Sequence, residues 1–178
     1  MKGKILISSP NLLTDMIFYK SIILLVDESY DGHTGFILNR PGGILFMKNE
    51  THTPSKKFKF NFGGPVSDQT FFITNKKIKN LEIFRVENSI YWGNNVKTAI
   101  ELINDGKISL NDIIFFQGYS GWDSEQLEFE IKNNSWIVID NYSFNLFNLK
   151  KNSWNKIIDG LGHEYKIWSN SPDDISLN

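Results

Sequence analysis

Short apolar runs separated by polar, turn-forming residues dominate the first part of the chain. Residues 4–8 predict a strand, and the unbroken apolar run 21–26 predicts a second strand that is buried on both faces. Residues 34–38 form a third apolar run. Because only the acidic, glycine-containing stretch 27–32 separates the last two runs, we expect them to pair as a hairpin. Residues 39–43 (NRPGG) carry a strong loop signal that ends the third strand.

Lysine and phenylalanine alternate through residues 56–62, which is the period-2 pattern of a strand with one exposed face. Gly63-Gly64-Pro65 ends this strand. The polar stretch 48–57, which contains Pro54, is expected to be the most mobile loop. Further strands are predicted over residues 70–74, 81–86, 89–92, 112–116 and 135–139.

Two amphipathic helices are marked by apolar residues that recur at i, i+3, i+4 and i+7. The first stripe consists of Val96, Ala99, Ile100 and Ile103, and the second of Trp154, Ile157, Ile158 and Leu161. Asn94 or Asn95 is expected to cap the first helix, and Ser153 the second. A glycine follows each helix, as is common at helix C-termini. Both stripes are interpreted as core-facing rather than as cofactor contacts.

Residues 118–122 (GYSGW) are predicted to form a turn between a strand and a third helix over 124–132. Asp123 is a good N-cap for that helix, and Gln126 falls three positions later, as in a capping box. Strands and helices therefore mix along residues 1–178 without regular β-α alternation, which favours a single α+β domain.

Composition narrows the function classes. The 178 residues carry a net charge of −1, so they lack the surplus of Lys and Arg that a dedicated nucleic-acid binder needs. The absence of cysteine excludes disulfides and thiolate metal sites. The longest apolar block is too short to span a bilayer, so we expect a soluble, cytoplasmic protein. No cofactor motif is present.

Metal binding is not expected, because the three histidines are far apart in the sequence and lack ligand-like spacing. The acidic residues Asp27, Glu28 and Asp31 could hold a cation. An acidic turn without fixed ligand spacing is more simply explained as a solvated hairpin loop.

A serine hydrolase is one alternative function. Ser120, Asp140 and His163 follow one another in the order found in α/β-hydrolases. The elbow pattern G-x-S-x-G would need glycine at position 122, where the chain has Trp122. Order alone does not define a triad, so no catalytic residue is assigned.

Direct DNA binding is the second alternative. Lys56, Lys57 and Lys59 interleave with Phe58 and Phe60, a pattern that a nucleic-acid-binding sheet can show. The simpler interpretation is a strand with one apolar face and one solvated lysine face, which also protects a sheet edge.

With these motifs in view, the chain resembles the YqgE/AlgH family over nearly its whole length. The similar segments are the opening ILISSP with Phe18, then GFILNRP at 35–41, GGPV at 63–66, GYSGW at 118–122, and Gln126-Leu127-Glu128 with Glu130 and Trp136. Ser120 stands where the family usually has alanine. Ser124 and Glu125 also depart from the family pattern, as does the lack of histidine at Glu28 and Asn75.

The resemblance implies an α+β fold in which a bent mixed or antiparallel sheet closes toward a pseudobarrel and is flanked by helices. It also implies the label of transcriptional regulator. None of these motif residues points to DNA contact, and the family's biochemical activity is unsettled.

We therefore expect a non-enzymatic regulatory or binding domain that acts on a small-molecule or protein partner, as a monomer or weak homodimer. Three glycine-bearing loops can bring backbone close to a ligand, and Arg40 adds a positive charge suited to carboxylate or phosphate. The candidate surface comprises Asn39, Arg40, Pro41, Gly63, Gly64, Pro65, Gly118, Tyr119, Gly121, Trp122, Gln126 and Glu128.

Overall fold

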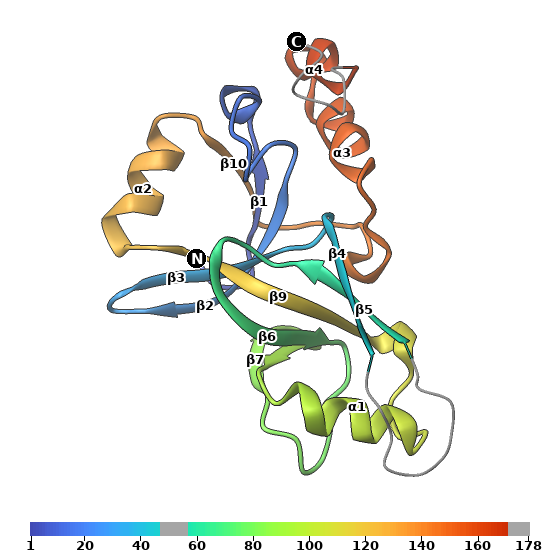
Figure 1. Ribbon diagram of the computed structural model, residues 1–178. Helices are drawn as coiled ribbons and strands as arrows, with labels where there is room; N and C mark the ends of the chain where they lie inside the picture. Colours follow the sequence, from blue (N-terminus) through green and yellow to red (C-terminus); the bar gives the residue numbers. More distant parts are fainter. Residues whose placement is uncertain (47–56, 171–178) are drawn as a thin grey trace.

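A bent sheet with helices along its outside forms the framework of the protein in this computed structural model, which describes residues 1–46 and 57–170 (Figure 1). Its strands are β1 (Ile5–Ser8), β2 (Ile22–Ser29), β3 (Gly32–Ile37), β4 (Pro41–Phe46), β5 (Lys57–Phe62), β6 (Val66–Thr74), β7 (Phe84–Glu87), β8 (Ile90–Gly93), β9 (Ile113–Trp122) and β10 (Trp136–Ile139). Neighbouring strands follow the order β10-β1-β2-β3-β9-β6-β8-β7, and β4 pairs with β5 beside this path.

The first three strands form as their apolar runs predict. The β2 and β3 strands make the expected hairpin, with Ser29 opposite Gly32. All residues from Ile22 to Val26 are fully buried, which confirms burial on both faces. This burial follows from the position of β2 inside the sheet, between β1 and β3.

The β9 strand joins the two parts of the sheet. Its C-terminal half pairs with β3, where Gly35 lies opposite Ser120. Its N-terminal half lies between β6 on one side and β5 on the other, and the pairing with β5 is parallel. The predicted turn at 118–122 is therefore wrong, because the GYSGW residues continue the strand. Gly118 has φ +69°, and this left-handed residue accompanies an irregular register with β6 between Val66 and Thr70.

The β4 strand corrects a second expectation. Residues 39–43 were predicted to be a loop, yet β4 begins at Pro41, which lies opposite Asn61 of β5. Proline is tolerated there because it is the first residue of a strand that pairs on one side only. The loop predicted over 48–57 lies outside the described residues except for Lys57, which begins β5.

The predicted helices form close to their expected bounds, as α1 (Val96–Asn104), α2 (Ser124–Lys132) and α3 (Ser153–Leu161), followed by the short α4 (Lys166–Ser169). Asn95 caps α1 by accepting from the Thr98 N–H at 3.2 Å. The cap of α3 is Asn152 rather than Ser153. Among the described helices, none is long and apolar enough to cross a bilayer.

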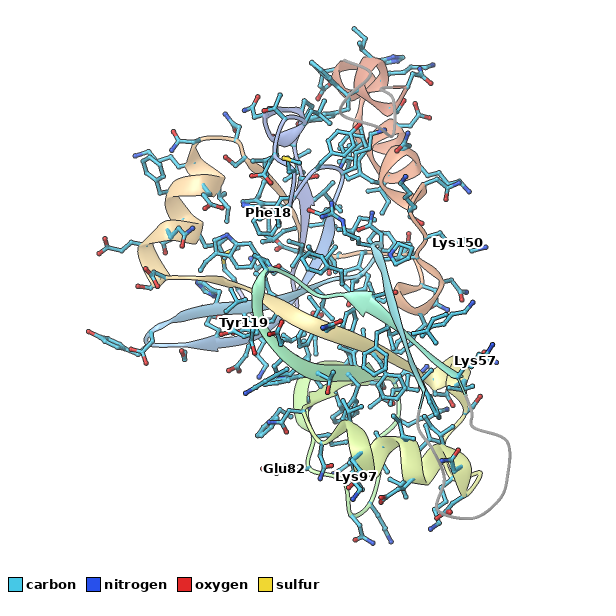
Figure 2. The ribbon with its side chains drawn as sticks, viewed as in Figure 1. Phe18, Lys57, Glu82, Lys97, Tyr119 and Lys150 are labelled. Carbon is cyan, nitrogen blue, oxygen red and sulfur yellow. The ribbon has the colours of Figure 1, made fainter. Side chains whose placement is uncertain are left out.

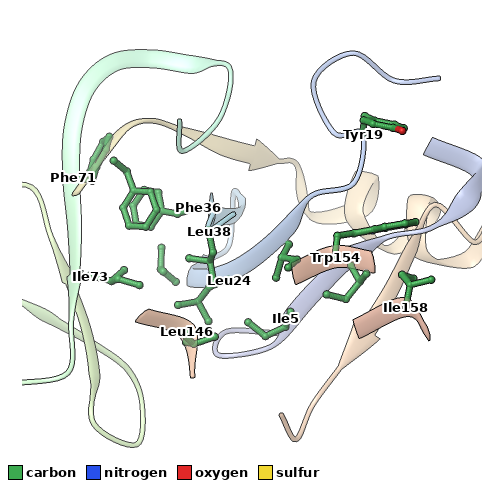
Figure 3. Packing of buried hydrophobic residues seen from close by; sticks show 14 of the residues in the cluster. Ile5, Tyr19, Leu24, Phe36, Leu38, Phe71, Ile73, Leu146, Trp154 and Ile158 are labelled. Carbon is green, nitrogen blue, oxygen red and sulfur yellow. The ribbon is translucent and has the colours of Figure 1, made fainter. Parts of the chain in front are cut away.

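Trp154 attaches α3 to the sheet. Its side chain is fully buried, and its indole Nε1 donates to the backbone oxygen of Ser8 at 2.9 Å. Figure 3 shows Trp154 and Ile158 beside Ile5, in the same apolar cluster as Phe36. A second cluster lies between α1 and the sheet, and a third beneath α2.

The sheet bends but does not close within the described residues. The β7 edge comes close to β2, although no ladder joins the two strands. A Cβ at Gly3 would lie only 2.3 Å from Oε2 of Glu87, which shows how closely the β7 edge approaches the segment before β1. The expected α+β fold, with a bent mixed sheet and flanking helices, is confirmed.

The packing around Gly118 predicts a large loss of stability in Gly118→Ala. A Cβ there would meet the backbone oxygen of Gly64 at 2.4 Å, whereas Gly106 has a similar φ of +72° and nothing within 4 Å. Gly106→Ala should cost only the left-handed strain of about 1–2 kcal/mol. Gly118→Ala should lose about 1–3 kcal/mol more from overpacking. Urea unfolding of both variants measures this difference, and equal losses would contradict the packing argument.

Candidate functional site

Asn39 is a buried tether between the end of β3 and the start of β2. Its Oδ1 accepts from the Ile22 N–H at 2.9 Å, and its Nδ2 donates to the Lys20 oxygen at 2.8 Å. The side chain is 5% exposed, so these bonds satisfy an amide that would be costly to bury alone. Asn39 therefore positions the backbone of Lys20.

Arg40 is held by the same segment. Its Nη2 donates to the Tyr19 oxygen at 2.9 Å, and its Nη1 donates to the Ile17 oxygen. The guanidinium also lies over the Phe62 ring, 5.9 Å from its centroid. Burial lowers the pKa of Arg40, and the charge of Asp15 acts in the opposite direction. Arginine nevertheless stays protonated in proteins, so a permanent cation lies in a fixed orientation here.

Lys20 is the second cation beside this tether. It is only 6% exposed and has a left-handed φ of +48°. Its Nζ lies 5.5 Å from the centroid of the Tyr19 ring and 5.4 Å from that of Trp154. Buried cations and left-handed non-glycine residues both carry a cost, and such costs concentrate at functional sites.

A cavity of about 340 Å³ brings these groups together. It is lined by Tyr19, Lys20, Asn39, Arg40, Pro41 and Lys151. Three of the lining residues are cationic, and none of the described residues that line it is acidic. Lysine and arginine side chains that converge without a lining carboxylate favour an anion in the cavity. We name it the Arg40 cavity.

A larger cleft adjoins the Arg40 cavity, with which it shares Asn39, Pro41 and Lys151. It has a volume of about 680 Å³ and is lined by residues of the β4-β5 ribbon and of the connection 147–151 that leads to α3. Lys59, Lys150 and Lys151 are the charged residues among its lining. Figure 2 shows Lys150 on this connection, pointing away from the body of the protein. We name this hollow the β4-β5 cleft.

The glycine motifs meet, but in a packing contact rather than around a hollow. Cβ atoms at Gly63 and Gly64 would come within 2.2 Å of the backbone at Gly118 and Tyr119. Neither glycine, nor Pro65 or Gly118, lines the Arg40 cavity or the β4-β5 cleft. These glycines therefore have a sufficient structural role in letting two backbone segments touch.

The structure of β9 argues against the serine hydrolase alternative. Ser120 is fully buried, and its Oγ donates to the Gly63 oxygen at 3.2 Å. Asp140 instead pairs with Lys4 at 2.9 Å, and His163 lies exposed after α3. The strand-turn-helix junction on which a nucleophile elbow depends is absent, because residues 118–122 are a strand.

The end of β9 and α2 are joined by Glu130. Its carboxylate accepts from the indole Nε1 of Trp122 at 2.9 Å, from that of Trp136 at 2.7 Å and from Gln126 Nε2 at 2.8 Å. Phe18 stacks on Trp122 with the ring centroids 6.0 Å apart. Gln126 and Trp122 thus hold α2 in place, while Glu128 is exposed on the same helix.

Tyr119, Gly121 and Trp122 line a separate, shallow groove beside the β2-β3 hairpin. It shares no described lining residue with the Arg40 cavity. The two regions approach each other at residues 17–18, because Arg40 donates to the Ile17 oxygen and Phe18 stacks on Trp122. Of the expected surface, Asn39, Arg40 and Pro41 line the Arg40 cavity, whereas Tyr119, Gly121 and Trp122 line this groove.

The alternating lysines and phenylalanines of β5 form a strand with two distinct faces. Phe58 and Phe60 are 1% and 4% exposed and pack toward α1, so they present no ring for base stacking. Lys57 and Lys59 lie on the exposed face.

The carboxylates of the acidic turn already have cationic partners within the protein. Asp27 pairs with Lys2, and Glu28 pairs with the N-terminal amine. That ammonium and the Lys2 N–H lower the pKa of Glu28.

Sequence patterns did not point to several residues of the cavity. Tyr19, Lys20 and Lys151 belong to none of the motifs or candidate sites that the sequence offered. Only the tertiary contacts bring them to Arg40. The one signal for the cavity in the sequence was a basic residue, Lys20, directly before the buried run 21–26.

Comparisons with known proteins agree on one family. The AlgH-like family model matches residues 5–166. A UPF0301 protein of Cytophaga hutchinsonii is 34% identical over 182 residues, which cover 99% of this chain and 98% of that protein. A UPF0301 protein of Bacteroides fragilis is 35% identical over 184 residues, covering 99% and 91% of the two chains.

Two solved structures are similar in fold. The solution structure of the AlgH protein from Pseudomonas aeruginosa matches with a TM-score of 0.71 at 19% identity, covering 96% of this chain and 93% of that one. The crystal structure of protein DIP2367 from Corynebacterium diphtheriae matches with a TM-score of 0.66 at 15% identity, covering 96% and 92%. At these identities the likeness establishes the fold alone.

The contacts of Glu130 predict a specific structural defect in Glu130→Gln. Both indole donors bind the same carboxylate oxygen, and an amide in its place offers them an uncharged acceptor. A hydrogen bond to a charged group contributes about 1.5–3 kcal/mol against about 0.5–1.5 kcal/mol for a neutral pair, so a loss of about 1–2 kcal/mol is expected. Urea unfolding, monitored by tryptophan fluorescence, should show this loss of unfolding free energy. Glu128→Gln, an exposed change on the same helix, is the matched control, and an equal effect in both would argue against the network.

Proposed function

The chain belongs to the AlgH-like family, and on that basis we propose that it is a non-enzymatic cytoplasmic domain that binds a small anionic ligand in the Arg40 cavity. A single observation carries the proposal. Lys20, Arg40 and Lys151 line one cavity, and none of the described lining residues is acidic.

The gathering of these three cations around one cavity explains why an anion is favoured. The protein carries a net charge of −1, so a local gathering of positive charge is not a consequence of overall composition. Lys20 is 6% exposed and lies beside the half-buried Arg40, and the exposed Lys151 borders the same cavity. An anion in the cavity can accept charge-assisted hydrogen bonds from these side chains.

The cavity is suited to binding rather than catalysis. Two donors of Arg40 are held by the oxygens of Ile17 and Tyr19, which fixes the guanidinium as a recognition group. Lys151 is exposed at the border of the cavity and can adjust to a ligand. A regulatory role would follow if binding stabilises the 17–20 segment, because that segment also contacts Trp122 through Phe18.

DNA binding is the alternative to the proposed function, and it can be tested directly. Its support is the exposed lysine face of β5, whereas the buried Phe58 and Phe60 speak against base stacking. Contact with phosphates through lysines predicts a steep fall of affinity with salt. Retention of duplex DNA at low salt, lost on Lys57→Met with Lys59→Met, would favour this alternative.

The proposal predicts that inorganic phosphate or short carboxylates raise the melting temperature by preferential binding to the folded state. Lys151→Met should weaken this binding about tenfold or more, because a hydrogen bond to a charged group contributes about 1.5–3 kcal/mol. Lys151 is exposed, so the variant should fold normally. Isothermal titration calorimetry gives the affinities.

Lys156→Met is the matched control, because it removes one exposed lysine that does not line the cavity. The control should bind like the unmodified protein. Equal weakening in both variants would indicate a general charge effect. If the unmodified protein binds neither phosphate nor carboxylate, the proposed function is wrong.

A further inference from the structure

The Arg40 cavity opens into a second volume that differs from it in chemistry. The β4-β5 cleft shares Asn39, Pro41 and Lys151 with the cavity, so a ligand in one can extend into the other. The cleft is about 680 Å³ against about 340 Å³ for the cavity. Sites for small molecules occupy about 300–1,000 Å³, which both volumes satisfy.

Apolar residues form much of the lining of the cleft. Leu38 and Phe60 are almost fully buried in the core, so the accessible apolar side chains are Ile44, Phe147 and Leu149. Ile44 is 54% exposed, although it faces a hollow rather than a flat surface. An exposed apolar side chain in a concave site can be covered by a ligand at a gain in free energy.

Two glycines keep one wall of the cleft free of side chains. Gly42 lies against β5, and a Cβ there would be 2.8 Å from the Phe60 oxygen. Gly43 has nothing within 4 Å of its Cβ position, so it leaves open space. The register between β4 and β5 shifts between Pro41 and Ile44, which displaces this stretch from regular pairing.

The charged residues of the cleft are all lysines. Lys59, Lys150 and Lys151 are exposed, and none of the described residues that line the cleft is acidic. Lysine places its ammonium in water while its aliphatic stem covers apolar surface. The cleft therefore offers an apolar interior with positive charge at its border, beside a cavity that holds Arg40 and Lys20.

From this arrangement we propose that the ligand is an amphipathic anion. Its carboxylate or phosphate group occupies the Arg40 cavity, and its hydrocarbon body lies in the β4-β5 cleft along Ile44 and Leu149. This inference rests on the proposed function and goes beyond it by defining the class of the ligand. A compact inorganic anion would use the cavity and leave the apolar cleft empty.

A homologous series tests the inference directly. Affinities of straight-chain carboxylates from four to ten carbons, and of matching alkyl phosphates, are measured by calorimetry below their micelle concentrations. Each methylene that enters the cleft should tighten Kd, by about fourfold at most, which corresponds to about 0.8 kcal/mol. Inorganic phosphate supplies the affinity of the head group alone.

Ile44→Ser and Ile167→Ser form a matched pair, because both isoleucines are exposed, by 54% and 79%, and only Ile44 lines the cleft. Ile44→Ser should reduce the gain per methylene and leave phosphate affinity unchanged. Ile167→Ser should leave both unchanged. A similar reduction in the two variants would overturn the assignment of the hydrocarbon body to the cleft.

The outcomes separate this inference from the proposed function. Affinity that does not change with chain length, together with binding of phosphate, overturns the amphipathic ligand and leaves the anion site standing. No binding of any probe overturns both. Vesicles that contain an anionic phospholipid test whether the amphipathic anion is a free molecule or part of a membrane. Binding to vesicles without binding of soluble chains would mean that the site contacts a membrane surface. That result would overturn the inference of a soluble ligand.

Discussion

The contact between the backbone of Gly63–Gly64 and that of Gly118–Tyr119 is the constraint on which the rest of the structure depends. Cβ atoms at Gly63, Gly64 and Gly118 would each lie within 2.4 Å of the opposing backbone, so only glycine permits this approach. The contact lies where β9 leaves its pairing with β5 and β6 and begins its pairing with β3. One strand can therefore serve both parts of the sheet, and the sheet bends at that point.

Two side-chain tethers, Asn39 and Arg40, connect this framework to the candidate site and fix the positions of its residues. Asn39 binds the backbone on both sides of Ser21, since it donates to the Lys20 oxygen and accepts from the Ile22 N–H. Arg40 then reaches the oxygens of Ile17 and Tyr19. Both tethers use side chains to satisfy buried backbone groups, which gives the cations fixed positions. On the other side of this segment, Phe18 contacts Trp122, whose indole is bound by Glu130.

Several elements could be predicted because their signals are local. The buried run of β2, the apolar stripes of α1 and α3, and the cap of α2 each depend on residues within a few positions of one another. The path of β9 could not be predicted, since Gly118 and Gly121 have the composition of a turn. Pairing with residues far away in the sequence, 33–35 of β3 and Val66 of β6, keeps these residues extended. The same limit applies to Pro41, which is a strand residue because Asn61 lies opposite.

By itself, the sequence determined the family, the α+β class, the faces that the helices bury and Arg40 as a cation in a candidate site. Short-range periodicity and ordered motifs carry that information, because they depend on neighbours along the chain. The tertiary structure decided that the glycine motifs are a packing contact and that Ser120 is buried. It also decided that Lys20, Arg40 and Lys151 share a cavity that adjoins an apolar cleft. These facts depend on contacts between segments distant in sequence, whose approach is set by sheet pairing and packing rather than by any local pattern.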